Sequence, residues 1–216
     1  VGMSGFSFGS EVTMWTAYNS SLLKAAAIAS TQINTSYFWA NALPGRNLSA
    51  VLDKGFGLGW PDRDPAIWAK VSPAQNTARL STPLLMQLPE DEARWMGEML
   101  ASGLRDGKAV ELHAFADEAH AKMQPRHKLA AYTRNFDWFR FWLDGNCDPA
   151  PDKHEQYRRW FAFSDRAAAA GQPLDVAHPK LDVGDFERAK IIGAGGGQGC
   201  REIGPHRVSV DQPGVG

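Results

Sequence analysis

The sequence predicts an α/β protein with a parallel sheet. Strand-like runs at 25–30, 83–88 and 109–115 alternate with helix-like segments, and this alternation usually gives a parallel sheet with helices on its faces. The run at 83–88 is entered through a proline, and the run at 109–115 alternates apolar and polar residues as a strand does. With 216 residues, of which 44% are hydrophobic and 22% charged, the chain is long and apolar enough to bury a core.

The first twenty residues predict a strand, a tight turn and a helix. Residues 1–3 are extended in character, residues 10–18 form a plausible helix, and GFSFG at 5–9 has the form G-x-S-x-G. That context is the one in which this motif forms a nucleophile elbow, a strained turn that lifts a serine hydroxyl above the sheet. Ser7 is therefore the candidate nucleophile, and the backbone N–H of Phe8 is the candidate oxyanion donor.

The elbow motif also explains two of the glycines. The turn is so tight that the residues two before and two after the serine should lack bulk, so we expect Gly5 and Gly9 for steric reasons. The alternative is a glycine-flexed loop without chemistry. Ser4 lies nearby but is not flanked by glycine on both sides.

Two later strand ends provide an acid and a histidine. Asp91 follows the strand at 83–88, and His120 follows the strand at 109–115, so serine, acid and histidine occur in the chain order of an α/β-hydrolase. We therefore predict Asp91 and His120 as the partners of Ser7. The structural alternatives are a helix N-cap for Asp91 and a loop histidine for His120.

Three helices complete the predicted core. The first covers 92–105, with Gly107 where a cap would lie, the second covers 125–143, and the third covers about 152–168. On the second helix an apolar stripe falls on one face, and Trp138 and Trp142 lie beside it; we interpret this stripe as core packing. The stripe consists of Leu129, Tyr132, Phe136, Phe139 and Leu143.

Other classes of site and partner lack support in the sequence. The net charge of −1 gives no basic field for nucleic acid, and no apolar run of about 18 residues predicts a membrane span. Cys147 and Cys200 have no zinc spacing, there is no H-E-x-x-H motif, and we expect neither a metal nor a cofactor. His113, inside a strand, is expected to be satisfied by its neighbours, and His127 lies at the start of the second helix.

The C-terminal part differs in composition. Residues 184–216 hold nine of the 21 glycines, and we expect 171–216 to be a low-complexity, disordered tail. A dinucleotide-binding loop at 193–199 is not supported, because no helix pattern follows it.

These residues resemble the catalytic domain of the prolyl oligopeptidase family of serine peptidases. The similar segments are GMSGFSFGSE around Ser7, SPAQNTARLSTPLLMQLPEDEAR around Asp91, and GKAVELHAFADEAHAKMQPRHK around His120. The resemblance covers about 1–145 and implies the C-terminal part of an α/β-hydrolase domain, followed by a helical extension at 146–170. Gln87-Leu88, together with RNFDWFRFWLDG at 134–145, is similar to the lasso peptide isopeptidase branch.

That resemblance implies hydrolysis of an amide bond through an acyl-enzyme, with a lasso peptide as the substrate and its isopeptide bond as the bond that breaks. The alternatives are a general prolyl or acylaminoacyl oligopeptidase, a non-catalytic remnant, and a plain binding module. The family places a β-propeller domain, several strands and a second oxyanion donor before the nucleophile. We therefore expect this chain to be a fragment of a longer protein, and we expect a cytoplasmic location.

Overall fold

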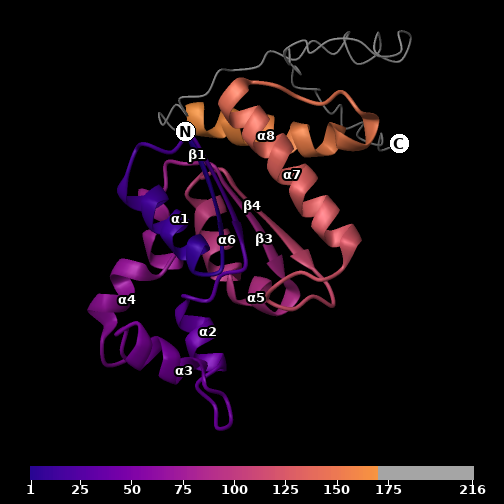
Figure 1. The fold of residues 1–216 in the computed structure, drawn as a ribbon. Coiled ribbons are helices and arrows are strands. Elements are labelled where there is room, and N and C mark those ends of the chain that lie inside the picture. Colours follow the sequence, from indigo (N-terminus) through magenta and orange to yellow (C-terminus); the bar gives the residue numbers. More distant parts are fainter. Residues whose placement is uncertain (170–216) are drawn as a thin grey trace, which may run out of the picture.

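A computed structural model describes residues 1–169 of the protein as a parallel sheet flanked by helices (Figure 1). The four strands lie in the order β1-β2-β3-β4, and every neighbouring pair is parallel. They are β1 (Gly2–Phe6), β2 (Ala25–Ala29), β3 (Leu84–Pro89) and β4 (Val110–Phe115). The predicted α/β class is confirmed. The tail predicted at 171–216 lies outside the described residues, as does Cys200.

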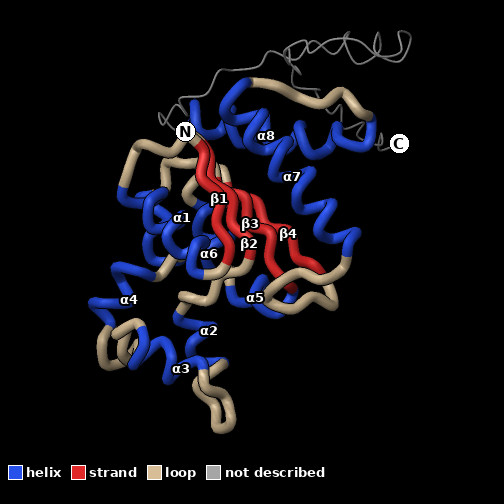
Figure 2. The backbone as a smooth tube through the Cα atoms, viewed as in Figure 1, coloured by secondary structure: helices blue, strands red, loops and turns tan. Residues whose placement is uncertain are grey.

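Helices cover both faces of the sheet (Figure 2). The helices α1 (Phe8–Asn19), α5 (Glu90–Trp95) and α6 (Gly97–Arg105) bury methionine and leucine side chains against one face. The helices α7 (Pro125–Asp144) and α8 (His154–Ala169) bury tryptophans and Phe141 against the other. The central strand β2 contributes to both layers. Its Ala26 and Ile28 pack with α1, α5 and α6 on one face of the sheet, and its Ala25 and Ala27 pack with α7 and α8 on the other.

The connection between β2 and β3 is a long excursion, for which the sequence predicts no regular elements. It contains α2 (Thr35–Ala40), α3 (Leu48–Ala50), a π-helical turn (Val51–Gly55), α4 (Pro65–Val71) and a 3-10 segment (Ala74–Arg79). The excursion has a small hydrophobic core of its own, formed by Phe38, Leu52, Leu58 and Trp68. This excursion extends beyond the carboxyl ends of the strands (Figure 1).

The predicted helix at 92–105 is two helices in the structure. The break lies at Met96, whose backbone (φ −91°, ψ 2°) leaves the helical region and whose N–H donates to the carbonyl of Ala93. The break lets Met96 and Met99 both point into the core, where each is at most 1% exposed.

The predicted packing of α7 is wrong for most of the stripe, of which Phe139 does pack against the core. Leu129, Tyr132 and Phe136 are 68%, 70% and 62% exposed, whereas Trp138 and Trp142 are buried. The helix has two apolar faces, and the face with the tryptophans packs against the sheet. Periodicity identifies an apolar face but does not say which of two faces meets the sheet.

The predicted third helix is α8, which is fixed to the sheet by a buried carboxylate. Glu111 on β4 accepts hydrogen bonds from the indole of Trp160 at 2.7 Å and from Arg159 at 3.0 Å. His113 contacts the same carboxylate at 2.6 Å, which agrees with its expected role as a histidine satisfied by its neighbours. No helix within residues 1–169 is long and apolar enough to cross a membrane.

Candidate active site

The carboxyl ends of the four parallel strands bring distant residues to one edge of the sheet. Ser7 follows β1, Gln32 follows β2, Glu92 lies in α5 directly after β3, and His120 lies in the loop after β4. Parallel strands place all these connections at the same edge, which is where α/β proteins build their sites. The order of the strands thus assembles the candidate site.

Ser7 occupies a strained turn, as the motif predicts. Its φ of 56° and ψ of −127° are unusual for a residue with a side chain, and its N–H donates to the carbonyls of Ala29 and Ser30 at 3.2 and 3.1 Å. A Cβ on Gly5 would lie 2.1 Å from the carbonyl oxygen of Gly9, so Gly5 is sterically required. The steric expectation for Gly9 itself is wrong, because a Cβ there would meet no atom within 4 Å.

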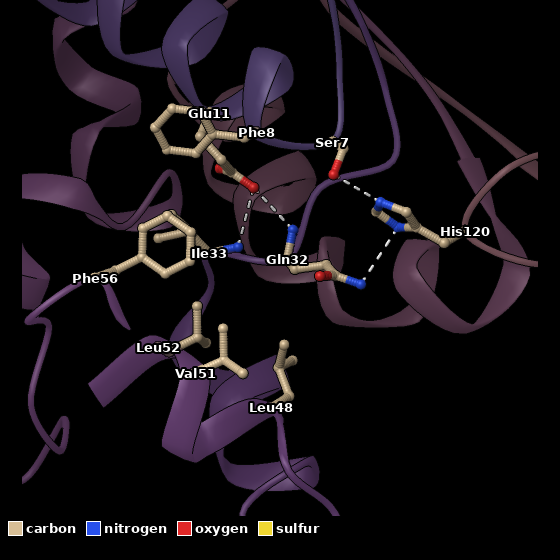
Figure 3. A pocket seen from close by; sticks show the side chains of 10 residues that line it. All are labelled: Ser7, Phe8, Glu11, Gln32, Ile33, Leu48, Val51, Leu52, Phe56 and His120. Carbon is tan, nitrogen blue, oxygen red and sulfur yellow. Dashed lines mark hydrogen bonds between the residues drawn. The ribbon is translucent and has the colours of Figure 1, made fainter. Parts of the chain in front are cut away.

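Ser7, His120 and Glu92 form a hydrogen-bonded line. The Oγ of Ser7 is 2.8 Å from Nε2 of His120, and Nδ1 of His120 is 2.5 Å from Oε1 of Glu92 (Figure 3 shows the first contact). A carboxylate can only accept at Nδ1, so Nδ1 carries the proton and Nε2 is free to accept the serine proton. This is the arrangement in which a histidine can activate a serine hydroxyl.

The acid on His120 is therefore Glu92 and not Asp91, which corrects the sequence-based assignment. The Asp91 side chain points to solvent, and its Oδ1 accepts the N–H of Glu92 at 3.0 Å. Both residues lie in the first turn of α5, where successive side chains are about 100° apart, so only one of them can face the site. Glu92 faces inward, and its side chain is 2% exposed.

Burial shapes the chemistry of that carboxylate. Burial raises the pKa of the Glu92 carboxyl, and its hydrogen bonds with His120, with the N–H of Thr31 and with the Gln32 amide oppose part of that rise. The Thr31 N–H donates to Oε2 at 2.9 Å, and the Gln32 amide donates to Oε1 at 3.3 Å. The ionised form thus depends on these donors, as expected for a charge removed from water.

The loop that carries His120 is held on both sides. Ser30 donates its hydroxyl to the His120 carbonyl at 2.5 Å. The carboxylate of Glu118 accepts the N–H groups of Met123 and Gln124 at 2.6 and 3.1 Å and contacts Nδ1 of His127 at 2.7 Å. His127, at the start of α7, therefore ties the loop to the helix that follows it.

A pocket opens beside Ser7 and His120 (Figure 3). It offers a cavity volume of about 90 Å³ and is open to solvent on one side, and Glu11 and Gln32 contribute its other polar groups. The apolar walls are Phe8, Ile33, Leu48, Val51, Leu52 and Phe56. Most of them come from the excursion after β2, and the rings of Phe8 and Phe56 lie 5.6 Å apart. The pocket can hold an apolar part of a ligand next to the serine hydroxyl.

The backbone supplies a donor for a developing negative charge. Phe8 is the first residue of α1, so its N–H has no acceptor within the helix. It follows Ser7 directly, as the sequence predicts for an oxyanion donor. Among residues 1–169, no group of three or more His, Cys, Asp or Glu side chains lies where it could share a metal ion.

Sequence reasoning missed Glu92, Gln32 and Ser30. Glu92 stands next to the predicted acid, so the sequence signal was correct to within one residue. Gln32 and Ser30 follow β2, and no motif marks them. Only the strand order, which puts β2 between β1 and β3, brings them beside the histidine.

Known proteins share both the sequence and the fold of this chain. The model of the prolyl oligopeptidase family matches residues 1–146. The lasso peptide isopeptidase AtxE2 of Asticcacaulis excentricus is 39% identical over 182 residues, which are 83% of this chain and 25% of that protein. A solved structure of an AtxE2 isopeptidase variant with Astexin3-dC4 bound has 36% identity and a TM-score of 0.69, covering 77% of this chain and 25% of that one.

A more distant structure shares the fold. An acylaminoacyl peptidase of Pyrococcus horikoshii has 19% identity and a TM-score of 0.56, covering 67% of this chain and 24% of that one. The chain thus spans about a quarter of the length of the relatives that it matches.

Proposed function

From the premise that the chain belongs to the prolyl oligopeptidase family, we propose that Ser7, His120 and Glu92 are the catalytic triad of a serine peptidase. The observation that carries the proposal is the hydrogen-bonded line from the Ser7 hydroxyl through His120 to Glu92, at 2.8 and 2.5 Å. The family model matches residues 1–146, a range that contains all three residues.

The geometry supports a two-step hydrolysis. Nε2 of His120 takes the proton of Ser7 as Oγ attacks the amide carbonyl, and the N–H of Phe8 stabilises the negative oxygen of the tetrahedral intermediate. The imidazolium, stabilised by Glu92, gives its proton to the leaving nitrogen, and the C–N bond breaks to leave an acyl-enzyme. Water, deprotonated by the same imidazole, attacks the ester and releases the acid and Ser7.

We propose the isopeptide bond of a lasso peptide as the amide that is cleaved. The support is the 39% identity to a lasso peptide isopeptidase, of which this chain covers a quarter. An isopeptide is an amide between a side-chain carboxyl and an amine, so the triad chemistry is the same as for a main-chain bond. A β-propeller domain before this segment stays a prediction.

Two measurements test the proposal separately. A fluorophosphonate probe should label Ser7 in the wild-type protein and leave Ser7→Ala unlabelled; absence of labelling in the folded protein contradicts the triad. Incubation with a lasso peptide should give a product heavier by one water that has lost its ring. Cleavage of linear peptides with the lasso peptide left intact would instead assign a general oligopeptidase.

A further inference from the structure

We propose that Glu11 is a positioning residue of this site, which acts through the loop at 31–33 to hold Glu92 and His120 in their reactive arrangement. The inference rests on the proposed function, because it assigns a role in the same chemistry. Glu11 lies one helical turn after Ser7 on α1 and lines the same pocket. The triad does not use it.

One carboxylate oxygen of Glu11 accepts hydrogen bonds from three consecutive residues of the loop at 31–33. Its Oε1 accepts the Thr31 hydroxyl at 2.8 Å and the N–H groups of Gln32 and Ile33 at 2.9 and 3.2 Å (Figure 3 shows the two backbone contacts). Three donors on one oxygen fix three consecutive residues relative to α1. The loop therefore cannot shift without losing hydrogen bonds to a half-buried charge.

The same loop holds the acid and the histidine. The Thr31 N–H and the Gln32 amide both donate to Glu92, and Nε2 of Gln32 is also 3.3 Å from Nδ1 of His120. The loop is thus clamped between two carboxylates, with Glu11 from α1 on one side and Glu92 from α5 on the other. A displacement of Gln32 would release the oxygen of Glu92 that contacts His120.

Keeping Glu11 ionised at this position costs desolvation energy, which a neutral side chain would not cost. Burial raises the pKa of the Glu11 carboxyl, the hydrogen bonds from the loop oppose that rise, and the neighbouring Glu92 adds to it. The second oxygen, Oε2, accepts no hydrogen bond from the part of the chain that the structure describes. A neutral residue would fill this position with less desolvation, so what distinguishes Glu11 is the set of hydrogen bonds that its Oε1 accepts from residues 31–33.

Three variants separate positioning from bulk packing. Glu11→Leu removes the acceptor at similar size. Glu11→Gln keeps an acceptor oxygen for the loop and puts its amide where Oε2 accepts nothing. Glu98→Gln, on the exposed first turn of α6, is the matched control for loss of one carboxylate.

The first readout is the rate at which a fluorophosphonate labels Ser7, normalised to folded protein. Glu11→Leu should slow it by about 10- to 100-fold, because a shift of about 1 Å in a reactive group can cost about 100-fold. Glu11→Gln should stay within about threefold of the wild type, and Glu98→Gln should not differ from it. Equal rates in Glu11→Leu and the wild type would overturn the inference.

The second readout does not need activity. The proton between Nδ1 of His120 and Glu92 should give a far-downfield proton NMR signal that disappears in Glu11→Leu and persists in Glu11→Gln. If the wild type is not labelled, the proposed function fails, and this signal alone decides the positioning role. If Glu11→Leu does not fold, Glu11→Asp replaces it: its shorter side chain should weaken the signal, and an unchanged signal would refute the role.

Discussion

The choice of Glu92 over Asp91 as the acid gives the sharpest prediction. In Glu92→Gln the side chain keeps its size but no longer carries the charge that faces Nδ1 of His120 at 2.5 Å. An amide there can present an N–H to the ring and select the tautomer in which Nε2 is protonated. That tautomer cannot accept the proton of Ser7, so kcat should fall steeply while KM changes little.

The structure sets the size of the effect. Glu92 is 2% exposed at its side chain, so solvent cannot replace the lost interaction with the imidazolium. Loss of the equivalent acid in a well-characterised serine protease lowers kcat by about 10⁴-fold, or about 5 kcal/mol of transition-state stabilisation. We expect the same order here.

Asp91→Asn is the matched control one residue away. Its side chain is exposed, and Oδ1 of asparagine can still accept the N–H of Glu92, so the substitution should change stability by less than about 0.5 kcal/mol and kcat by less than about threefold. The assay is hydrolysis of the lasso peptide followed by mass spectrometry, with Ser7→Ala as the background. A collapse of kcat in Asp91→Asn, with Glu92→Gln still active, would refute the assignment.

Three further predictions test the fold around the site. Gly5→Ala should abolish labelling of Ser7 and destabilise the protein, because the new Cβ would lie 2.1 Å from the carbonyl oxygen of Gly9. Gly9→Ala should fold, because its new Cβ meets no atom within 4 Å, and calorimetry of both variants checks this. Burial raises the pKa of Glu11 above its unfolded value, so the native state binds the extra proton and stability falls as pH rises from about 4.5 through the native pKa. Urea unfolding across pH should show a smaller fall in Glu11→Gln, and an identical slope in both proteins would contradict this. Glu111→Ala should lower the free energy of unfolding by about 1 to 3 kcal/mol, because it leaves the buried indole N–H of Trp160 without an acceptor, whereas water can solvate the exposed guanidinium of Arg159; a loss under about 0.5 kcal/mol would count against it.

Local patterns in the chain were enough for much of the fold. The strands at 25–29, 84–89 and 110–115 are short apolar or alternating runs bounded by turn residues, and the structure contains all of them. The excursion after β2 was not predicted, because its helices are short and one of them is a π-helical turn without a regular apolar period. Short helices of this kind depend on tertiary packing, here around Phe38 and Trp68, for their stability.

The sequence by itself determined the features that depend on neighbours in the chain. The elbow at Ser7, the order of serine, acid and histidine, and the alternation that gives a parallel sheet all follow from local spacing. Only the tertiary structure decided between Asp91 and Glu92, and between the two apolar faces of α7. In each case the sequence offers two alternatives on one helix. Glu92 is selected because it faces the loop at 31–33 and His120, and the tryptophan face of α7 is selected because it packs against the sheet.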